Sequence, residues 1–136
     1  MKNLLLMIAF VLPIVSYADG TGLPMKANDY GTDGQEIYNS LCASCHMVDG
    51  KGAKGAGFYP SLVKNPKLES PIYIQDVVLY GVHAMPSIGG LLDDTQIANV
   101  INYVRTHFDN HYTDKVSPSD ITKLRAPNYQ YDTAFE

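Results

Sequence analysis

The chain is poor in cysteine, tryptophan and basic residues. It has two cysteines and no tryptophan in 136 residues, and its 14 acidic side chains outnumber its 10 lysines and arginines, which gives a formal net charge of -4. Two cysteines are too few for a disulfide-stapled scaffold, a four-cysteine zinc site or a four-cysteine iron–sulfur cluster within one chain. The acidic balance argues against a nucleic-acid partner bound through a basic surface. What remains is a small acidic protein whose length suits one domain.

Long apolar runs are also scarce, and the clearest one lies at the N-terminus. Lys2 precedes an apolar stretch over residues 4–15, and Ser16 and Ala18 are small residues at the spacing of a cleavage site. This pattern predicts a secretory signal peptide over residues 1–18. The stretch is short for a membrane span, and an uncleaved interfacial anchor is the alternative. We expect an exported chain, in the periplasm if the source is a Gram-negative bacterium. In such an oxidising compartment two cysteine thiols do not normally stay free and idle.

The rest of the sequence has helical periodicity and no strand-like alternation of useful length. Apolar residues recur at helical spacing most clearly over residues 97–108, whereas glycine-rich stretches at 47–65 and 82–92 are typical of loops. Capping signals predict four helix starts: Thr32 with Gln35, Ser70 with Pro71, Asp93 with Gln96, and Ser117 with Pro118. We expect an all-α fold, with a flexible lead-in at 19–31, one domain at 32–108 and a C-terminal extension with one short helix at 109–136.

Residues 42–46 carry the chemistry. They read Cys-Ala-Ser-Cys-His, and this C-x-x-C-H spacing is the attachment signature of c-type haem. Cys42 and Cys45 can add to the two vinyl groups on one edge of the porphyrin, and His46 can then bind the iron from one face. A thiol–disulfide oxidoreductase site and half of a zinc site are alternatives. The first lacks a βαβ context, and the second lacks another ligand pair.

A haem iron has a second axial position, and Met85 is the leading candidate for it. Thioether sulfur suits Fe(II), and a Met/His pair favours reversible electron transfer. Met85 stands in a loop before Pro86 and outside any helical stripe, where a methionine would simply fill the core. His83 is the chemical rival, because it is close in sequence and imidazole also binds haem iron.

From residue 33 to 105 the sequence resembles the class I cytochromes c of the small bacterial type. Gly34 and Tyr38 stand where the N-terminal helix of that family has a glycine and an aromatic residue, and Val100 and Tyr103 match its C-terminal helix. Met85 falls in its distal-ligand motif. The resemblance implies a small cytochrome c fold, in which three or four core helices surround one covalently attached haem c with its iron, and the two helices cross near Gly34.

The resemblance also concerns the loop after the haem motif. Pro60, Ser61 and Leu62 are similar to the family's Pro-x-Leu, in which the proline carbonyl receives the ring N–H of the proximal histidine. Pro60 is thereby expected to orient His46. The absence of tryptophan is a departure, since the family often uses one to contact a haem propionate. The sequence does not decide whether Tyr59, Tyr73 or Tyr80 replaces it.

The resemblance implies a single-electron carrier whose partners are redox proteins, namely a dehydrogenase, a reductase or an oxidase. Because protein ligands fill both axial positions, no catalytic turnover is expected. The alternative is a subunit of a larger dehydrogenase or oxidase complex, because residues 116–121 are similar to the tails of such cytochrome subunits. A monomer or a subunit of a complex is expected. A haem sensor or enzyme with an open distal site is the third interpretation.

Overall fold

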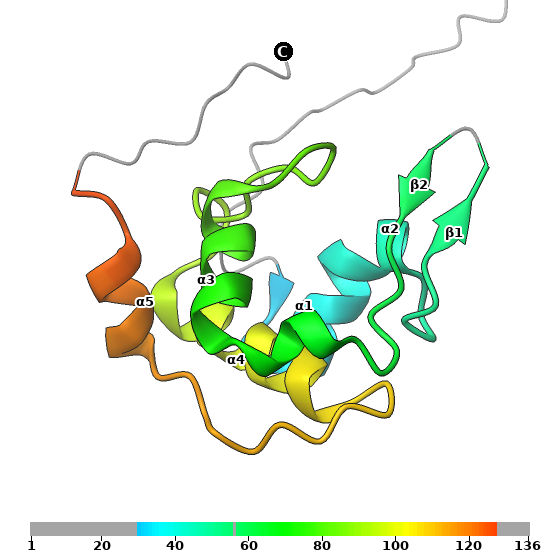
Figure 1. The fold of residues 1–136 in the computed structure, drawn as a ribbon. Coiled ribbons are helices and arrows are strands. Elements are labelled where there is room, and N and C mark those ends of the chain that lie inside the picture. Colours follow the sequence, from blue (N-terminus) through cyan, green and yellow to red (C-terminus); the bar gives the residue numbers. More distant parts are fainter. Residues whose placement is uncertain (1–29, 56, 128–136) are drawn as a thin grey trace, which may run out of the picture.

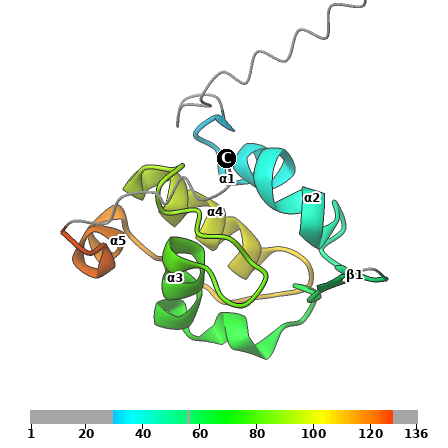
Figure 2. The ribbon, with the colours of Figure 1, turned by 90° about the horizontal axis from the view of Figure 1, so that it is seen from above.

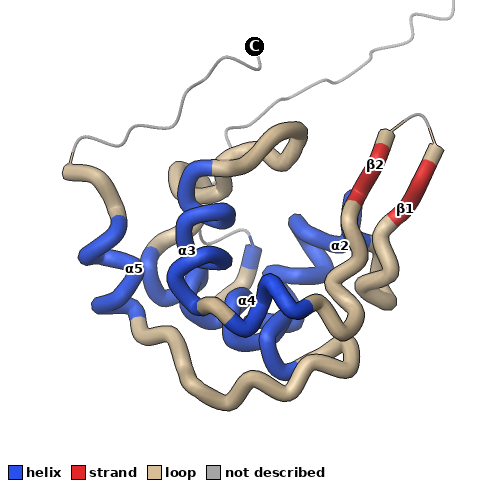
Figure 3. The backbone as a smooth tube through the Cα atoms, in the orientation of Figure 1, coloured by secondary structure: helices blue, strands red, loops and turns tan. Residues whose placement is uncertain are grey.

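The computed structural model describes residues 30–55 and 57–127. The predicted signal peptide at 1–18, nearly all of the lead-in at 19–31 and the last residues of the extension lie outside the described residues. The described part consists of helices joined by loops, with one very small hairpin (Figures 1 and 3). The expected helical class is therefore confirmed.

The helices follow the order that the sequence predicts. The first helical stretch joins α1 (Gly34–Ile37), a π-helical turn (Tyr38–Cys42) and α2 (Ala43–His46). The later helices are α3 (Pro71–Tyr80), α4 (Asp94–Thr106) and α5 (Pro118–Leu124). A short 3₁₀ helix at Pro66–Glu69 and two strands, β1 (Ala53–Lys54) and β2 (Phe58–Tyr59), complete the fold. The strands pair antiparallel and are too short for residue alternation to reveal them.

Side-chain caps explain most of the helix starts. Ser70 caps α3, while Asp93 and Ser117 form capping boxes on α4 and α5, as predicted. The prediction for α1 is wrong by one residue, because the Asp33 carboxylate accepts the Gln35 amide at 2.8 Å. The carbonyl of Thr32 instead accepts a hydrogen bond from the Asn99 side chain at 2.8 Å. Asp33 therefore caps the first helix, and Thr32 joins it to α4.

Helix α4 is the centre of the core and packs against α1, α3 and α5 (Figures 1 and 2). Its buried apolar face consists of Ile97, Ala98, Val100, Ile101 and Val104. The predicted stripe is confirmed up to Val104, but Phe108 lies beyond the end of the helix with a φ of 58°.

The crossing of α1 and α4 requires a glycine at position 34. A Cβ atom there would lie 2.4 Å from the Asn99 carbonyl oxygen and 2.8 Å from the Tyr103 Cβ atom. Those distances are shorter than van der Waals contact, so any side chain would push the helices apart. The Tyr38 and Tyr103 rings meet beside the crossing with centroids 5.6 Å apart. The expected approach of the two helices at Gly34 is therefore confirmed.

The described part of the C-terminal extension packs on the core. Val116 and Ile121 are buried in the same apolar cluster as the α4 stripe. Asn102 ties the chain before α5 to α4, since its amide side chain both donates to the Val116 carbonyl at 2.8 Å and accepts from the Val116 amide at 2.9 Å. The extension is thus part of the folded body up to α5.

Candidate haem site

The C-x-x-C-H residues lie at the end of the first helical stretch. Cys42 ends the π-helical turn, and Cys45 and His46 lie in the last turn of α2. Residues three and four positions apart share one side of a helix, so both thiols and the imidazole lie on the same side. The thiols are free and half-buried, with no disulfide between them. This arrangement fits two thioether bonds to one flat group with a ligand beside them.

The thiol of Cys42 is not tuned for thiol–disulfide exchange. Burial, together with the nearby Cys45 thiol, raises the pKa of Cys42 to about 12. A thiol with such a pKa is protonated at neutral pH, and the thiolate is the reactive form in exchange. At Cys42 the oxidoreductase alternative therefore gains no support. The zinc alternative also gains no support, because no cluster of three His, Cys, Asp or Glu side chains suited to a metal occurs in residues 30–55 and 57–127.

His46 is oriented by the loop that follows it. Its Nδ1 atom lies 3.0 Å from the carbonyl oxygen of Pro60. Because a carbonyl only accepts, this contact assigns the ring proton to Nδ1 and leaves the lone pair of Nε2 for a ligand bond. The predicted contact with Pro60 is present, and a neutral imidazole in this tautomer is the form that binds iron.

The glycines around His46 let the loop return to the helix. Met47 has a φ of 64° and ends α2, and the Gly52 amide donates to the His46 carbonyl at 3.0 Å. A Cβ atom on Gly52 would lie 2.1 Å from the Tyr59 carbonyl oxygen and 2.8 Å from that of Pro60. Gly52 also has a φ of 66°, which side chains rarely tolerate. The position of the Pro60 carbonyl therefore depends on the absence of a side chain at residue 52.

Tyr38 supports the same loop from the first helical stretch. Its side chain is fully buried, and its hydroxyl donates to the Met47 carbonyl at 2.6 Å. Burial raises the pKa of Tyr38, so the hydroxyl keeps the proton that it donates. The sequence assigned Tyr38 to the helix crossing alone. The signal in the sequence is the hydroxyl itself, because a buried tyrosine, unlike a phenylalanine, usually has a hydrogen-bond partner.

Met85 lies in a tight loop after α3. The Val82 and Met85 backbones exchange hydrogen bonds at 2.9 and 3.1 Å, with His83 and Ala84 at the turn. Met85 is half-buried and packs on the core, whereas His83 is exposed with a φ of 53°. In Figures 1 and 2 this loop extends from α3 in the direction of the β1–β2 hairpin. Burial thus distinguishes the two candidate ligands and favours Met85.

Gly81 fixes the path of this loop. It ends α3 with a φ of 74°, and a Cβ atom on it would lie 2.5 Å from the Met85 carbonyl oxygen. The loop then folds back on the helix, where the Ile88 amide donates to the Val78 carbonyl at 2.9 Å and the Gly89 amide to the Leu79 carbonyl at 3.2 Å. Carbonyls at a helix end have no partner within the helix, so the loop supplies their hydrogen bonds.

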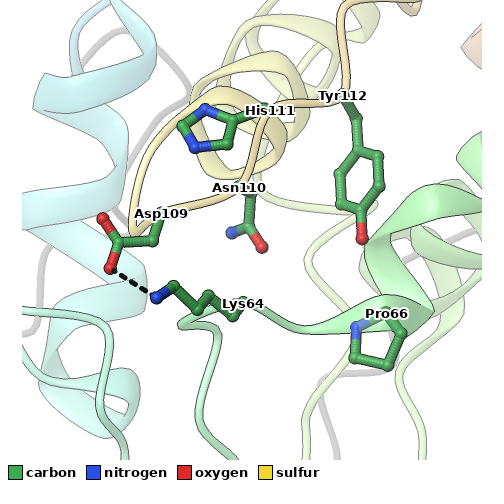
Figure 4. A pocket seen from close by; sticks show the side chains of 6 residues that line it. All are labelled: Lys64, Pro66, Asp109, Asn110, His111 and Tyr112. Atoms are coloured by element: carbon green, nitrogen blue, oxygen red, sulfur yellow. Dashed lines mark ion pairs between the residues drawn. The ribbon is translucent and has the colours of Figure 1, made fainter.

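The structure also has a pocket whose lining includes none of the predicted site residues. It has a volume of about 260 Å³ and is lined by Lys64, Pro66, Asp109, Asn110, His111 and Tyr112. Figure 4 shows the Lys64 ammonium turned towards the Asp109 carboxylate, 3.7 Å away. Asn110 is buried and donates to the carbonyls of Leu62 and Val104 at 2.8 and 3.0 Å. These contacts join the loops after β2 and α4.

The helices and the C-x-x-C-H site together define a class of proteins that bind haem covalently. Residues 30–104 match the family model described as "Cytochrome C oxidase, cbb3-type, subunit III". The chain belongs to this cytochrome c family. Membership of this family implies one covalently bound haem c with its iron.

Similar proteins fall into two groups. The chain is 38% identical over 118 residues to the fructose dehydrogenase cytochrome subunit of Gluconobacter japonicus. It is 34% identical over 117 residues to the cytochrome c subunit of the quinone alcohol dehydrogenase of Gluconobacter oxydans. Both alignments cover 76% of this chain but only 24% of the relative, so the chain spans about a quarter of those subunits. Cytochrome c6 of a Synechococcus species is 32% identical over 108 residues, with 76% of this chain and 91% of the relative covered.

One further observation concerns membranes. Among the helices of residues 30–127, none combines the length and the apolar character that a membrane span requires.

Proposed function

We propose that Cys42 and Cys45 form the two thioether bonds to the haem, and that His46 and Met85 are the axial ligands of its iron. The observation that carries this assignment is the His46–Pro60 contact of 3.0 Å, which fixes the tautomer that a ligating histidine needs. The shared helix side of the two thiols supports the covalent bonds, and the half-buried position of Met85 supports the sixth ligand.

The haem supplies a centre that gains and loses one electron, and the residues around it set its properties. A histidine that donates a hydrogen bond from Nδ1 is a more basic ligand, and a methionine opposite it raises the reduction potential. Two protein ligands leave no iron position for a substrate. The chain is therefore an electron carrier without catalytic turnover.

We propose further that the chain is exported and acts as a free carrier between redox proteins. The N-terminal pattern over residues 1–18 supports export. The alignment with 91% of a cytochrome c6 supports the role of a free carrier. The second candidate function is that of a subunit serving a dehydrogenase, which the identity of 38% to the fructose dehydrogenase cytochrome subunit supports.

The spectrum of the purified protein tests the assignment of the ligands. Reduction should give the sharp α and β bands of low-spin haem c, and the oxidised form should show the weak near-infrared band of an iron–methionine bond. Acid–acetone extraction should leave the haem on the polypeptide. A high-spin spectrum that changes with carbon monoxide would favour the sensor interpretation, and freely extracted haem would overturn the covalent assignment.

A second experiment separates the free carrier from the subunit. The protein is isolated from its native host in mild detergent and sized while its haem absorbance is followed. A free carrier elutes at the mass of the single chain. Co-elution with a dehydrogenase or oxidase through several columns would establish the subunit instead.

A further inference from the structure

The end of α5 contacts the beginning of the loop that carries Met85. The Tyr80 hydroxyl donates to the Leu124 carbonyl at 2.6 Å and accepts from the Ala126 amide at 2.8 Å. Tyr80 is the last residue of α3, directly before Gly81. The start of the loop is thus tied to a segment more than forty positions away in the sequence.

Arg125 contacts the other end of the same loop. Its guanidinium donates to the carbonyls of Gly89 and Leu92, the latter at 3.1 Å, and its Nε atom donates to the Asp94 carboxylate at 2.8 Å. The guanidinium and the carboxylate are both about three-quarters buried, with exposed fractions of 24% and 25%. Its planar guanidinium carries five N–H donors in a fixed fork, which suits acceptors that lie in several directions around it.

The segment that makes these contacts is itself anchored. Ile121 of α5 is fully buried, and the Thr122 hydroxyl donates to the Asp94 carboxylate at 2.6 Å. A loop without regular structure opens easily unless its ends are fixed. Here both ends of residues 81–92 are bonded to residues 124–126, which rest on the core. We call Tyr80, Leu124, Arg125 and Ala126 the C-terminal clamp.

We propose that Tyr80 and Arg125 are positioning residues, which fix the loop of residues 81–92 and thereby keep Met85 bound to the iron. This inference rests on the proposed role of Met85 as the sixth ligand. The family match ends at residue 104, so the clamp is contributed largely by residues beyond it. The C-terminal extension accordingly has a purpose within the chain, whatever partner the protein serves.

The test uses the haem-loaded protein with Arg125→Gln, which removes the guanidinium charge and its forked donors, and with Tyr80→Phe, which removes the hydroxyl of the clamp. Asp114→Asn is the matched control. It weakens another contact of the extension, the 2.7 Å ion pair between Asp114 and Arg105. The hydrogen bonds of Arg105 go to Leu68, Glu69 and Asp114, none of which belongs to the loop of residues 81–92.

Two readouts follow the loop and the ligand separately. The Met85 amide is bonded to Val82 within the loop, and the Ile88 and Gly89 amides are bonded to carbonyls of α3. Hydrogen exchange of these three amides reports opening of the loop without reference to iron. Carbon monoxide binding to the reduced protein reports how often Met85 leaves the iron. We expect both to become about tenfold faster in Arg125→Gln, because a hydrogen bond to a charged group is lost, and to change little in Asp114→Asn.

The outcomes distinguish the two proposals. Wild-type rates of both processes in Arg125→Gln and Tyr80→Phe would overturn the clamp, and so would faster loop exchange with an unchanged carbon monoxide rate. Equal acceleration in Asp114→Asn would also overturn it, since general destabilisation would then explain the effect. If Met85→Ala retains the near-infrared band, the ligand assignment itself fails. If Met85→Ala loses the band while the clamp variants keep it, the assignment of Met85 stands.

Discussion

The Nδ1 atom of His46 lies 3.0 Å from the Pro60 carbonyl oxygen, and a Cβ atom on Gly52 would lie 2.8 Å from that same oxygen. The orientation of the proposed iron ligand therefore depends on a residue six positions away that contributes no side chain. This relation makes the hydrogen bond accessible to mutation even though its acceptor is a backbone atom.

Gly52→Ala should displace the Pro60 carbonyl and weaken its bond to His46. A histidine with a weaker Nδ1 hydrogen bond donates less electron density to Fe(III), so the reduction potential should rise. Redox titration of the variant measures this shift. Gly55→Ala is the control, because a Cβ atom there would meet nothing within 4 Å. An unchanged potential in Gly52→Ala would mean that the contact does not tune the iron.

Met85→Ala should abolish the near-infrared iron–sulfur band and lower the reduction potential, because a soft ligand that stabilises Fe(II) is lost. His83→Ala should leave both nearly unchanged, since His83 is exposed at the turn. Absorption spectra and redox titrations of the two variants provide the comparison. The opposite ranking would transfer the sixth-ligand assignment to His83.

The parts of this fold that could be predicted from the sequence are those that depend on local patterns. The starts of α3, α4 and α5 depend on a capping side chain and the few residues after it, and all of these were predictable. At α1, Thr32 and Asp33 are adjacent and both can cap. The local pattern does not distinguish them, and the contact of the Thr32 carbonyl with Asn99 of α4 joins residues that are distant in sequence.

Long-range contacts of charged side chains could not be predicted from the sequence. Arg105 lies in the last turn of α4, where a cation favourable to the helix dipole is expected to be solvated. It is instead fully buried and donates to the carbonyls of Leu68 and Glu69 and to Asp114. Arg125 behaves similarly. Backbone carbonyls as partners leave no pattern in the sequence, so only the folded chain reveals these roles.

Gly34→Val should destabilise the haem-loaded protein by about 1–3 kcal/mol, because overpacking forces apart two helices in direct backbone contact. The nearest atom to the new side chain is the Asn99 carbonyl oxygen, which cannot rotate away. Thermal unfolding measures the loss. Gln35→Val, at an exposed position of the same helix, controls for the helix propensity of valine. Equal stability of the two variants would contradict the crossing.

Asp114 should contribute stability that depends on pH. Its hydrogen bond and ion pair with Arg105 hold the pKa of Asp114 below its usual range. A carboxyl whose pKa is lower in the folded state stabilises the protein above its unfolded pKa of about 3.9, and the contribution is lost as the pH falls through the folded pKa. Asp114→Asn should therefore be less stable than the unmutated protein at neutral pH and nearly equal to it in strong acid.

Thermal unfolding of both proteins across this pH range provides the measurement. Asp76→Asn, at an exposed position of α3, has the same change in charge and serves as the control. A difference between the Asp114→Asn variant and the unmutated protein that stays constant down to strong acid would show that the carboxylate charge does not matter to Arg105.

Electron exchange with a redox partner should depend only weakly on salt. Residues 81–90 contain no Asp, Glu, Lys or Arg. The lysines nearest the haem motif have their own contacts, because Lys51 pairs with Asp49 at 2.8 Å and Lys54 lies over the Phe58 ring at 5.8 Å. Phe58 is 64% exposed, so β2 presents an apolar side chain to solvent. An encounter through such a surface is brief and gains little from charge attraction.

Stopped-flow measurements with a dehydrogenase from the native host, from low to high ionic strength, test this expectation. Salt at about 0.1 M already screens exposed charges beyond about 10 Å, so steering by the net charge of -4 would fade within that range. A rate that changes by less than about threefold fits contact through apolar groups, because the tenfold or larger effects of steering would then be absent. A steep, monotonic fall in rate would instead establish that a basic partner is attracted to an acidic face, and Lys51→Glu and Lys54→Glu should then accelerate the reaction, because each removes a positive charge beside that face.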